Sequence, residues 1–188
     1  FGHTVSGTAS ITFITQGGAH LNQSVSNNRF NNLTVNTTGS VTFVSNSQTL
    51  PAANGVKNVN NNEIVTQFTK SGAGGTVTCF TDNGSDPAGS INNSNNNICS
   101  NITLTGATGF LGISNTNGGA PTKSVNGNTI SNVTTGSASM TAISSNFGGN
   151  NTTVANNIIS NISNTTTVTA LTLTGISIGS TGSGAAQS

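Results

Sequence analysis

The chain is almost free of charge, and phenylalanine is its only aromatic residue. Of its 188 residues only three are acidic and four are basic, and there is no tryptophan, no tyrosine and a single methionine. Four basic side chains can displace few counterions, which excludes a protein that binds nucleic acid by neutralising its phosphates. No apolar run approaches the roughly 20 residues of a membrane-spanning helix, so the sequence predicts no membrane span either.

Small polar residues fill the place that charged residues usually take. The chain contains 31 Asn, 32 Thr, 25 Ser and 24 Gly, together about 60% of the sequence. A composition so poor in apolar residues is compatible with disorder when it is taken alone. The order of the residues argues against disorder, because the apolar residues recur at regular intervals along the chain.

One short phrase recurs five times, and in each copy an Asn stands two residues before a large apolar residue, here called the anchor. Successive anchors are separated by 34, 34, 32 and 29 residues, and a second apolar residue follows each anchor. Such regular spacing does not arise by chance, so the recurring phrase marks an internal repeat. The Asn residues are Asn28, Asn62, Asn96, Asn128 and Asn157, and the anchors are Phe30, Ile64, Ile98, Ile130 and Ile159.

A second phrase lies about 9–13 residues after each anchor and is apolar at its first and fourth positions. A further copy, at residues 11–14, precedes the first anchor. The second position of this phrase is Thr in five of the six copies, with Leu111 as the exception. These residues form a predicted Thr row, which consists of Thr12, Thr42, Thr78, Thr141 and Thr169.

Both phrases predict short β-strands. The segments are brief, rich in β-branched residues and bounded by Asn, Gly and Ser, and no helical periodicity is present. A unit of about 30 residues with two or three short strands cannot bury its own apolar face, whereas stacked copies can. We therefore expect an all-β chain folded as a parallel β-helix, or β-solenoid, of five to six coils with roughly 29–34 residues each.

The repeats predict a single solenoid domain over residues 1–178 and a Gly/Ser-rich linker or inter-coil loop over residues 179–188. The sequence opens partway through one repeat and closes after the second phrase of another. We expect it to be a segment of a longer array.

The repeated residues have structural roles in this prediction. The anchors stack in a narrow interior. Each Asn precedes a strand at a sharp turn, where Asn tolerates the left-handed backbone region, and its amide can bond to the equivalent Asn of the next coil. The alternative to this Asn ladder is a ligand site lined by Asn. The Thr row has two interpretations: β-branched residues that pack on the pleated outer face of a sheet, or an array of hydroxyl groups that binds ice.

The inventory of reactive side chains argues against catalysis. Glycoside hydrolysis needs two carboxyl groups flanking the scissile bond, and a calcium-dependent lyase needs clustered carboxylates and a base. The only acids are Glu63, Asp82 and Asp86. Asp82 and Asp86 lie in a predicted turn and are interpreted as solvated loop acids, with a loose calcium pair as the alternative. His3 and His20 have no partners at metal-ligand spacing, so we expect no enzyme activity, no metal and no cofactor.

The two cysteines leave one question open. Cys79 belongs to the second phrase of one repeat, and Cys99 lies beside the anchor of the next. A disulfide between coils requires both side chains to face the same side, and an extracellular setting would allow it. The sequence alone does not decide this pairing.

The phrase Asn156-Asn157-Ile158-Ile159-Ser160-Asn161-Ile162, followed by a Thr/Gly-rich strand, resembles the right-handed β-helix repeats of large secreted bacterial surface proteins. It is especially similar to long Asn/Thr/Gly-rich proteins of Bacteroidetes-type bacteria. The resemblance covers roughly residues 4–178 and implies a right-handed helix, an extracellular or cell-surface location and export by outer-membrane secretion machinery. It is specific for architecture, because such repeats serve adhesins, filaments and enzyme scaffolds alike.

We expect a non-enzymatic structural or adhesive segment. An uncharged surface of amides and hydroxyls suits weak, multivalent contact with glycans or other surfaces. Open coil ends suit stacking on neighbouring coils or on copies of the same protein. The main alternative is a non-catalytic part of a polysaccharide lyase or glycosidase whose catalytic coils lie elsewhere, and an ice-binding protein is a further alternative.

Overall fold

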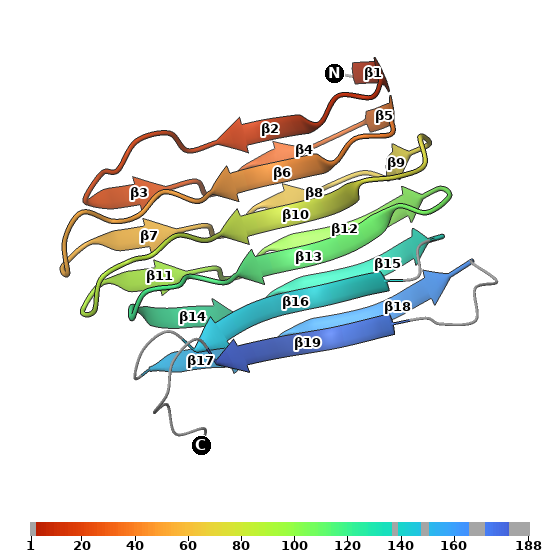
Figure 1. Cartoon of the computed structure of the whole chain (residues 1–188). Helices are drawn as coiled ribbons and strands as arrows, with labels where there is room; N and C mark the ends of the chain where they lie inside the picture. Colours follow the sequence, from red (N-terminus) through yellow and green to blue (C-terminus); the bar gives the residue numbers. More distant parts are fainter. Residues whose placement is uncertain (1–2, 137–138, 148–150, 166–171, 181–188) are drawn as a thin grey trace.

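The chain winds into a solenoid of about five coils, in which strands pair with their equivalents in the next coil (Figure 1). The computed structural model describes residues 3–136, 139–147, 151–165 and 172–180. Within these ranges all regular structure is β-strand, and no helix that could cross a membrane is found. The predicted all-β parallel solenoid is therefore confirmed. Residues 181–188 of the predicted linker lie outside the described residues.

Three parallel sheets form the walls of the solenoid, and they are here named A, B and C. Sheet A has eight strands: β1 (His3–Gly7), β4 (Arg29–Phe30), β5 (Leu33–Thr37), β8 (Glu63–Ile64), β9 (Phe68–Lys70), β12 (Ile98–Leu104), β15 (Thr129–Thr135) and β18 (Ile158–Asn164). Sheet B has six: β2 (Ile11–Thr15), β6 (Val41–Asn46), β10 (Thr76–Asp82), β13 (Gly109–Asn115), β16 (Ser139–Phe147) and β19 (Thr172–Ser180). Sheet C has five: β3 (Asn22–Ser24), β7 (Val56–Asn58), β11 (Ile91–Asn93), β14 (Thr122–Asn126) and β17 (Thr152–Ala155).

Each complete coil runs through sheet C, sheet A and sheet B in turn. Coil 1 contains β3 to β6, coil 2 β7 to β10, coil 3 β11 to β13, coil 4 β14 to β16 and coil 5 β17 to β19, and β1 and β2 precede coil 1. Equivalent residues of successive coils are 34, 35, 31 and 29 positions apart. Figure 1 shows the strands of sheet B in front, and the coils descend from the N-terminus in a right-handed sense.

Apolar side chains from sheets A and B fill the interior in columns. Near the N-terminus the ring of Phe43 lies 5.3 Å from Phe13, 5.1 Å from Phe30 and 4.9 Å from Phe68, measured between ring centroids. Each further coil adds its own few apolar side chains to the same core, so a low apolar content is sufficient for the fold. In one column of sheet B the four central members, Val41, Val77, Phe110 and Met140, are at most 3% exposed.

The prediction that Ile98 is an anchor is wrong. Cys99 occupies that interior column, in register with Ile130, and is fully buried. Ile98 points outward and is 38% exposed, in register with Glu63 and Thr129. Asn stands at both 96 and 97, so the phrase fits either residue, and Cys behaves as a small buried hydrophobe. The remaining anchors, Phe30, Ile64, Ile130 and Ile159, face the core, with Ile159 partly buried.

The Asn ladder passes through Asn97, which corrects the prediction of Asn96. Each ladder Asn donates from Nδ2 to Oδ1 of the next, at 2.9, 3.1, 3.0 and 2.9 Å along the axis. Asn96 is instead a turn residue with φ of 56°, in the left-handed region that Asn and Gly tolerate. The ladder is Asn28, Asn62, Asn97, Asn128 and Asn157, and the turn residues before it are Asn27, Asn61, Asn96, Gly127 and Asn156.

The Thr row lies along the outer face of sheet B. Thr169 lies outside the described residues, and the residue in register with Thr141 is Thr174. A second row of hydroxyls runs three positions further along the same strands, but its members Thr81 and Ser114 are only 9% and 5% exposed. The two rows therefore do not form a continuous exposed array. In axial order the first row is Thr12, Thr42, Thr78, Leu111, Thr141 and Thr174.

A disulfide joins Cys79 and Cys99 inside the solenoid. Cys79 lies in β10 of coil 2 and Cys99 in β12 of coil 3, their Cα atoms are 6.2 Å apart, and both are fully buried. The bond thus connects sheet B to sheet A and one coil to the next.

Candidate functional site

The outer face of sheet A carries three adjoining columns of uncharged polar side chains. They extend over several coils because parallel pairing brings equivalent residues of successive coils into register. The Ser column is Ser100, Ser131 and Ser160, the Asn column is Asn101, Asn132 and Asn161, and the hydroxyl column is Thr34, Thr69, Thr103, Thr134 and Ser163.

Hydrogen bonds tie the members of these columns together. Asn161 donates from Nδ2 to Oδ1 of Asn132 at 3.1 Å, and Asn132 donates to Oδ1 of Asn101 at 3.0 Å. All three Asn residues have φ between 52° and 59°, and this left-handed backbone accounts for the exposed position of their side chains between inward apolar residues. In the neighbouring column Thr134 and Ser163 share a hydrogen bond of 2.9 Å between their hydroxyls. The face is thus an ordered array of polar groups.

An open groove lies on this face where coils 2, 3 and 4 meet. It is lined by Gln67, Asn101, Thr103 and Asn132, none of which is charged. Gln67 reaches the groove because coil 2 has one more residue between its anchor and Phe68 than coil 3 has at the same place. The Nε2 atom of Gln67 donates a hydrogen bond to Thr103 Oγ1 at 3.2 Å. The lining offers amide and hydroxyl groups, which donate and accept hydrogen bonds with neutral polar ligands.

A second candidate site is buried at the corner between sheets B and C. Here polar side chains replace the apolar ones that fill most of the interior between sheets A and B. Each of the two sheets contributes a polar column, and the two columns face each other. Several of their buried atoms have no hydrogen-bond partner among the residues that the structure describes. Sheet C contributes Gln23, Lys57, Asn92, Lys123 and Thr152, and sheet B contributes Asn46, Asp82, Asn115 and Ser145.

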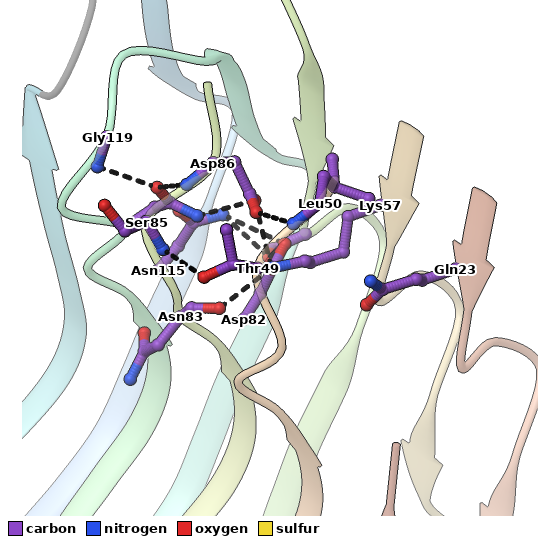
Figure 2. Close-up of polar contacts among 12 residues, drawn as sticks. Gln23, Thr49, Leu50, Lys57, Asp82, Asn83, Ser85, Asp86, Asn115 and Gly119 are labelled. Carbon is purple, nitrogen blue, oxygen red and sulfur yellow. Dashed lines mark hydrogen bonds and ion pairs between the residues drawn. The ribbon is translucent and has the colours of Figure 1, made fainter. Parts of the chain in front are cut away.

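Lys57 is paired with two carboxyl groups in this cluster (Figure 2). Its Nζ lies 3.0 Å from Asp86 Oδ2 and 3.7 Å from Asp82 Oδ1, and all three side chains are fully buried. The interpretation of Asp82 and Asp86 as solvated loop acids is therefore wrong. The turn after β10 folds inward over the corner and brings both carboxyl groups next to the ammonium group of Lys57. This ammonium group lies where the alternative interpretation, a loose calcium pair, placed the metal ion.

Buried surroundings shift the pKa values of two groups in the cluster. Burial raises the pKa of Asp82 to about 7, since desolvation penalises the carboxylate more than the nearby Lys57 stabilises it. Burial likewise lowers the pKa of Lys123 to about 8, against the opposing effect of Asp82 and Asp86. Lys123 Nζ donates to the backbone oxygens of Asn117 at 3.0 Å and of Asn146 at 2.9 Å. The cluster thus holds groups that change protonation near neutral pH.

The raised pKa of Asp82 predicts that acidification from above pH 7 toward pH 5 increases stability. The folded chain takes up this proton near pH 7 and the unfolded chain near its ordinary pKa of 3.8, so the folded state binds more protons in between. This contribution is complete below pH 3.8 and is lost as the pH rises through about 7. Melting curves by circular dichroism should show the rise in the wild-type chain and its absence in Asp82→Asn. Equal pH profiles for the two proteins would contradict the assignment.

Sequence reasoning missed this cluster, although a signal for it exists. Lys57 and Lys123 each stand five residues before a ladder Asn and two before an inward Val, so strand alternation points them into the core. Their aliphatic stems suit that position, and their ammonium groups then require buried acceptors. The same offset leads to Gln23, Asn92 and Thr152 in the other coils.

Comparisons with known protein families, curated proteins and solved structures gave no match to this chain. Within the described ranges no three His, Cys, Asp or Glu side chains lie together as a metal site would require.

Proposed function

We propose that the chain is a non-enzymatic structural and adhesive segment of a bacterial β-helix protein, and that the outer face of sheet A binds neutral glycans. The groove between Gln67, Asn101, Thr103 and Asn132 is the observation that carries this proposal. Its amides and hydroxyls complement the hydroxyl groups of a sugar, each of which donates and accepts hydrogen bonds.

The charge of the face favours neutral glycans over acidic ones. Arg29 and Glu63 are the only Arg and the only Glu of the chain, and they lie in register on sheet A. Their side chains form an exposed ion pair at 3.2 Å, so the two charges offset each other. The groove itself adds no charge. An acidic polysaccharide would therefore find no excess of positive charge on this face.

Repetition supports adhesion by weak contacts. Hydrogen bonds to exposed amides are individually worth little, because water competes for the same groups. The Asn and hydroxyl columns repeat the contact in successive coils, and a long glycan that follows the solenoid axis can meet several copies at once. Linked contacts of this kind raise avidity well above the affinity of one contact.

The proposed location is extracellular or on a bacterial cell surface. A buried disulfide is typical of proteins that fold in an oxidising compartment. The Bacteroidetes-type origin and export by outer-membrane secretion machinery rest on the resemblance of the repeat phrase alone. A scaffold or filament role belongs to the same proposal, but it uses the open coil ends, which can stack on other coils, and not the outer face of sheet A.

The test is binding to immobilised polysaccharides by surface plasmon resonance, with the chain displayed in multiple copies on particles. We expect binding to neutral polysaccharides, and a loss of about tenfold or more in avidity for the double variant Thr103→Ala/Asn132→Ala. The matched control is Thr141→Ala on the outer face of sheet B, which should bind as wild type does. Equal binding by the double variant, or no binding of the wild-type chain to any neutral polysaccharide, would overturn the adhesive part of the proposal.

A further inference from the structure

We propose that Lys57 and Asp86 become joined by an intramolecular amide bond, formed between Lys57 Nζ and Asp86 Cγ with loss of water, and that Asp82 carries the protons. The three side chains are fully buried at the corner of coil 2, where β7 begins the coil and the turn after β10 ends it (Figure 2). Such a bond would close coil 2 upon itself. It is a covalent modification of the chain and does not depend on glycan binding.

The nucleophile and the electrophile are already in contact. Lys57 Nζ lies 3.0 Å from Oδ2 of Asp86 and also donates to the backbone oxygen of Asn83 at 2.9 Å. These contacts hold the amine beside the carboxyl group from the moment the coil folds. A bimolecular encounter is thereby replaced by an intramolecular step with a high effective concentration.

Two donors hold the carboxyl group of Asp86 in one orientation. The backbone N–H of Leu50 donates to Oδ1 at 2.6 Å, and Asn117 Nδ2 donates to Oδ2 at 2.6 Å. Attack on Cγ places negative charge on Oδ1, where the N–H of Leu50 stabilises it as an oxyanion-hole donor does. Oδ2, which faces Lys57, is the oxygen that leaves.

Asp82 is placed to move protons between the two groups. Its Oδ1 lies 3.7 Å from Lys57 Nζ and accepts no hydrogen bond from the described part of the chain. Its Oδ2 accepts from Ser94 Oγ at 3.2 Å and from Asn115 Nδ2 at 3.4 Å. A carboxyl group whose pKa is raised to about 7 takes up and releases a proton readily near neutral pH. Asp82 removes one proton from the ammonium, which frees the lone pair for attack, and a second from the nitrogen after the N–Cγ bond has formed, and it delivers both to the departing oxygen Oδ2.

The reaction balances without an oxidant or a cofactor. The ammonium of Lys57 starts with three protons; one stays on the amide nitrogen, and two leave with Oδ2 as water. The N–Cγ bond forms, the Cγ–Oδ2 bond breaks, and Asp82 returns to its starting protonation state. The product is neutral, whereas the reactants are two opposite charges in a site without solvent. Because buried charges are costly even when paired, burial favours the amide.

The other two buried lysines lack this arrangement. Lys70 Nζ donates to the backbone oxygens of Gly72 and Gly74 and to Thr108 Oγ1. Lys123 Nζ donates to backbone oxygens and to the side-chain oxygen of Asn146. Within the described ranges neither amine forms an ion pair with a carboxyl group, so each provides a matched control for burial without the reactive partner.

The decisive measurement is the intact mass of the purified chain after full reduction of its disulfide. We expect a mass lower than the sequence mass by one water molecule, and tandem mass spectrometry should find the peptide of Lys57 joined to that of Asp86. The full sequence mass would overturn the proposal and leave a buried ion pair. A loss of ammonia would also overturn it, because it would place the bond at an asparagine.

Variants then test the role of each residue. Lys57→Met and Asp82→Asn should both show the full sequence mass, and Lys123→Met should keep the loss of water. Asp82→Asn retains both reacting groups, so loss of water in this variant would contradict the role of Asp82. Circular dichroism identifies variants that fold, and the mass of the wild-type chain decides whether the bond exists even if a variant does not.

Discussion

Replacement of Ile130 by alanine is expected to lower the free energy of unfolding by about 2–5 kcal/mol, the range for deletion of a fully buried aliphatic side chain. Ile130 is 0% exposed and stacks between Cys99 and Ile159. Gly112 of β13 packs against it so closely that a Cβ at 112 would lie 3.0 Å from Ile130 Cγ1. The backbone of the stacked coils restricts collapse around the vacated volume, so most of the cavity should remain. Urea unfolding followed by circular dichroism measures the loss.

The matched control for this prediction is Ile98→Ala. Ile98 has the same side chain, but it lies on the outer face at 38% exposure, where truncation should cost less than about 1 kcal/mol. The pair of variants therefore tests the register of coil 3 directly. A larger loss for Ile98→Ala than for Ile130→Ala would mean that the columns are assigned incorrectly.

Replacement of Asn128 by alanine is expected to cost about 1–3 kcal/mol for each buried polar group left without a partner. Asn128 Oδ1 accepts from the backbone N–H of Asn97 at 2.9 Å and from Asn97 Nδ2 at 3.0 Å. Its Nδ2 donates to the backbone oxygen of Ser94 at 2.8 Å and to Asn157 Oδ1 at 2.9 Å. Alanine removes both sets of partners at a residue that is 0% exposed. The loss should therefore approach that of Ile130→Ala.

The melting temperature of Asn128→Ala is compared with that of Asn151→Ala, which changes an exposed Asn of the next coil. Asn151→Ala should alter stability by no more than about 0.5 kcal/mol. If both variants melt as the wild-type chain does, Asn128 contributes nothing through its amide and the ladder has no energetic role.

The fold could be predicted from the sequence because stacked coils require similar side chains at equivalent positions. An interior column accepts similar side chains at each level, so Phe30, Ile64, Ile130 and Ile159 reveal the period directly. Coil 3 breaks the pattern because Cys99 replaces the large apolar residue and Ser94 replaces the Val found in other coils. The repeat pattern also fits coil 3 when it is placed one residue earlier, and Ile98 then takes the anchor position. Only the pairing of strands distinguishes these registers, because a slip of one residue reverses the direction of every side chain.

The candidate sites were harder to predict, for two different reasons. The columns on sheet A depend on which residues of neighbouring coils pair, and coil lengths that vary between 29 and 35 residues hide this register in the sequence. The charge cluster was missed because Lys57 and Asp86 lie far apart in the chain and each suits a solvated loop by composition. Alternation along β7 turns Lys57 inward, whereas burial of Asp86 follows from the inward fold of the turn after β10, which a Pro- and Gly-containing segment does not specify by itself.

The disulfide described above has a mechanical consequence. Hydrogen bonds between coils run along the axis, so tension on the two ends of the chain peels coils from the stack one after another. Cys79 and Cys99 are 20 residues apart in sequence, and the covalent bond transmits the load past β11 and the loops around it. That segment cannot be drawn out while the bond is intact. Under shear from flowing liquid, tension would thus pass directly from coil 2 to coil 3 through this bond, and the residues between the two cysteines would add no length to the extended chain.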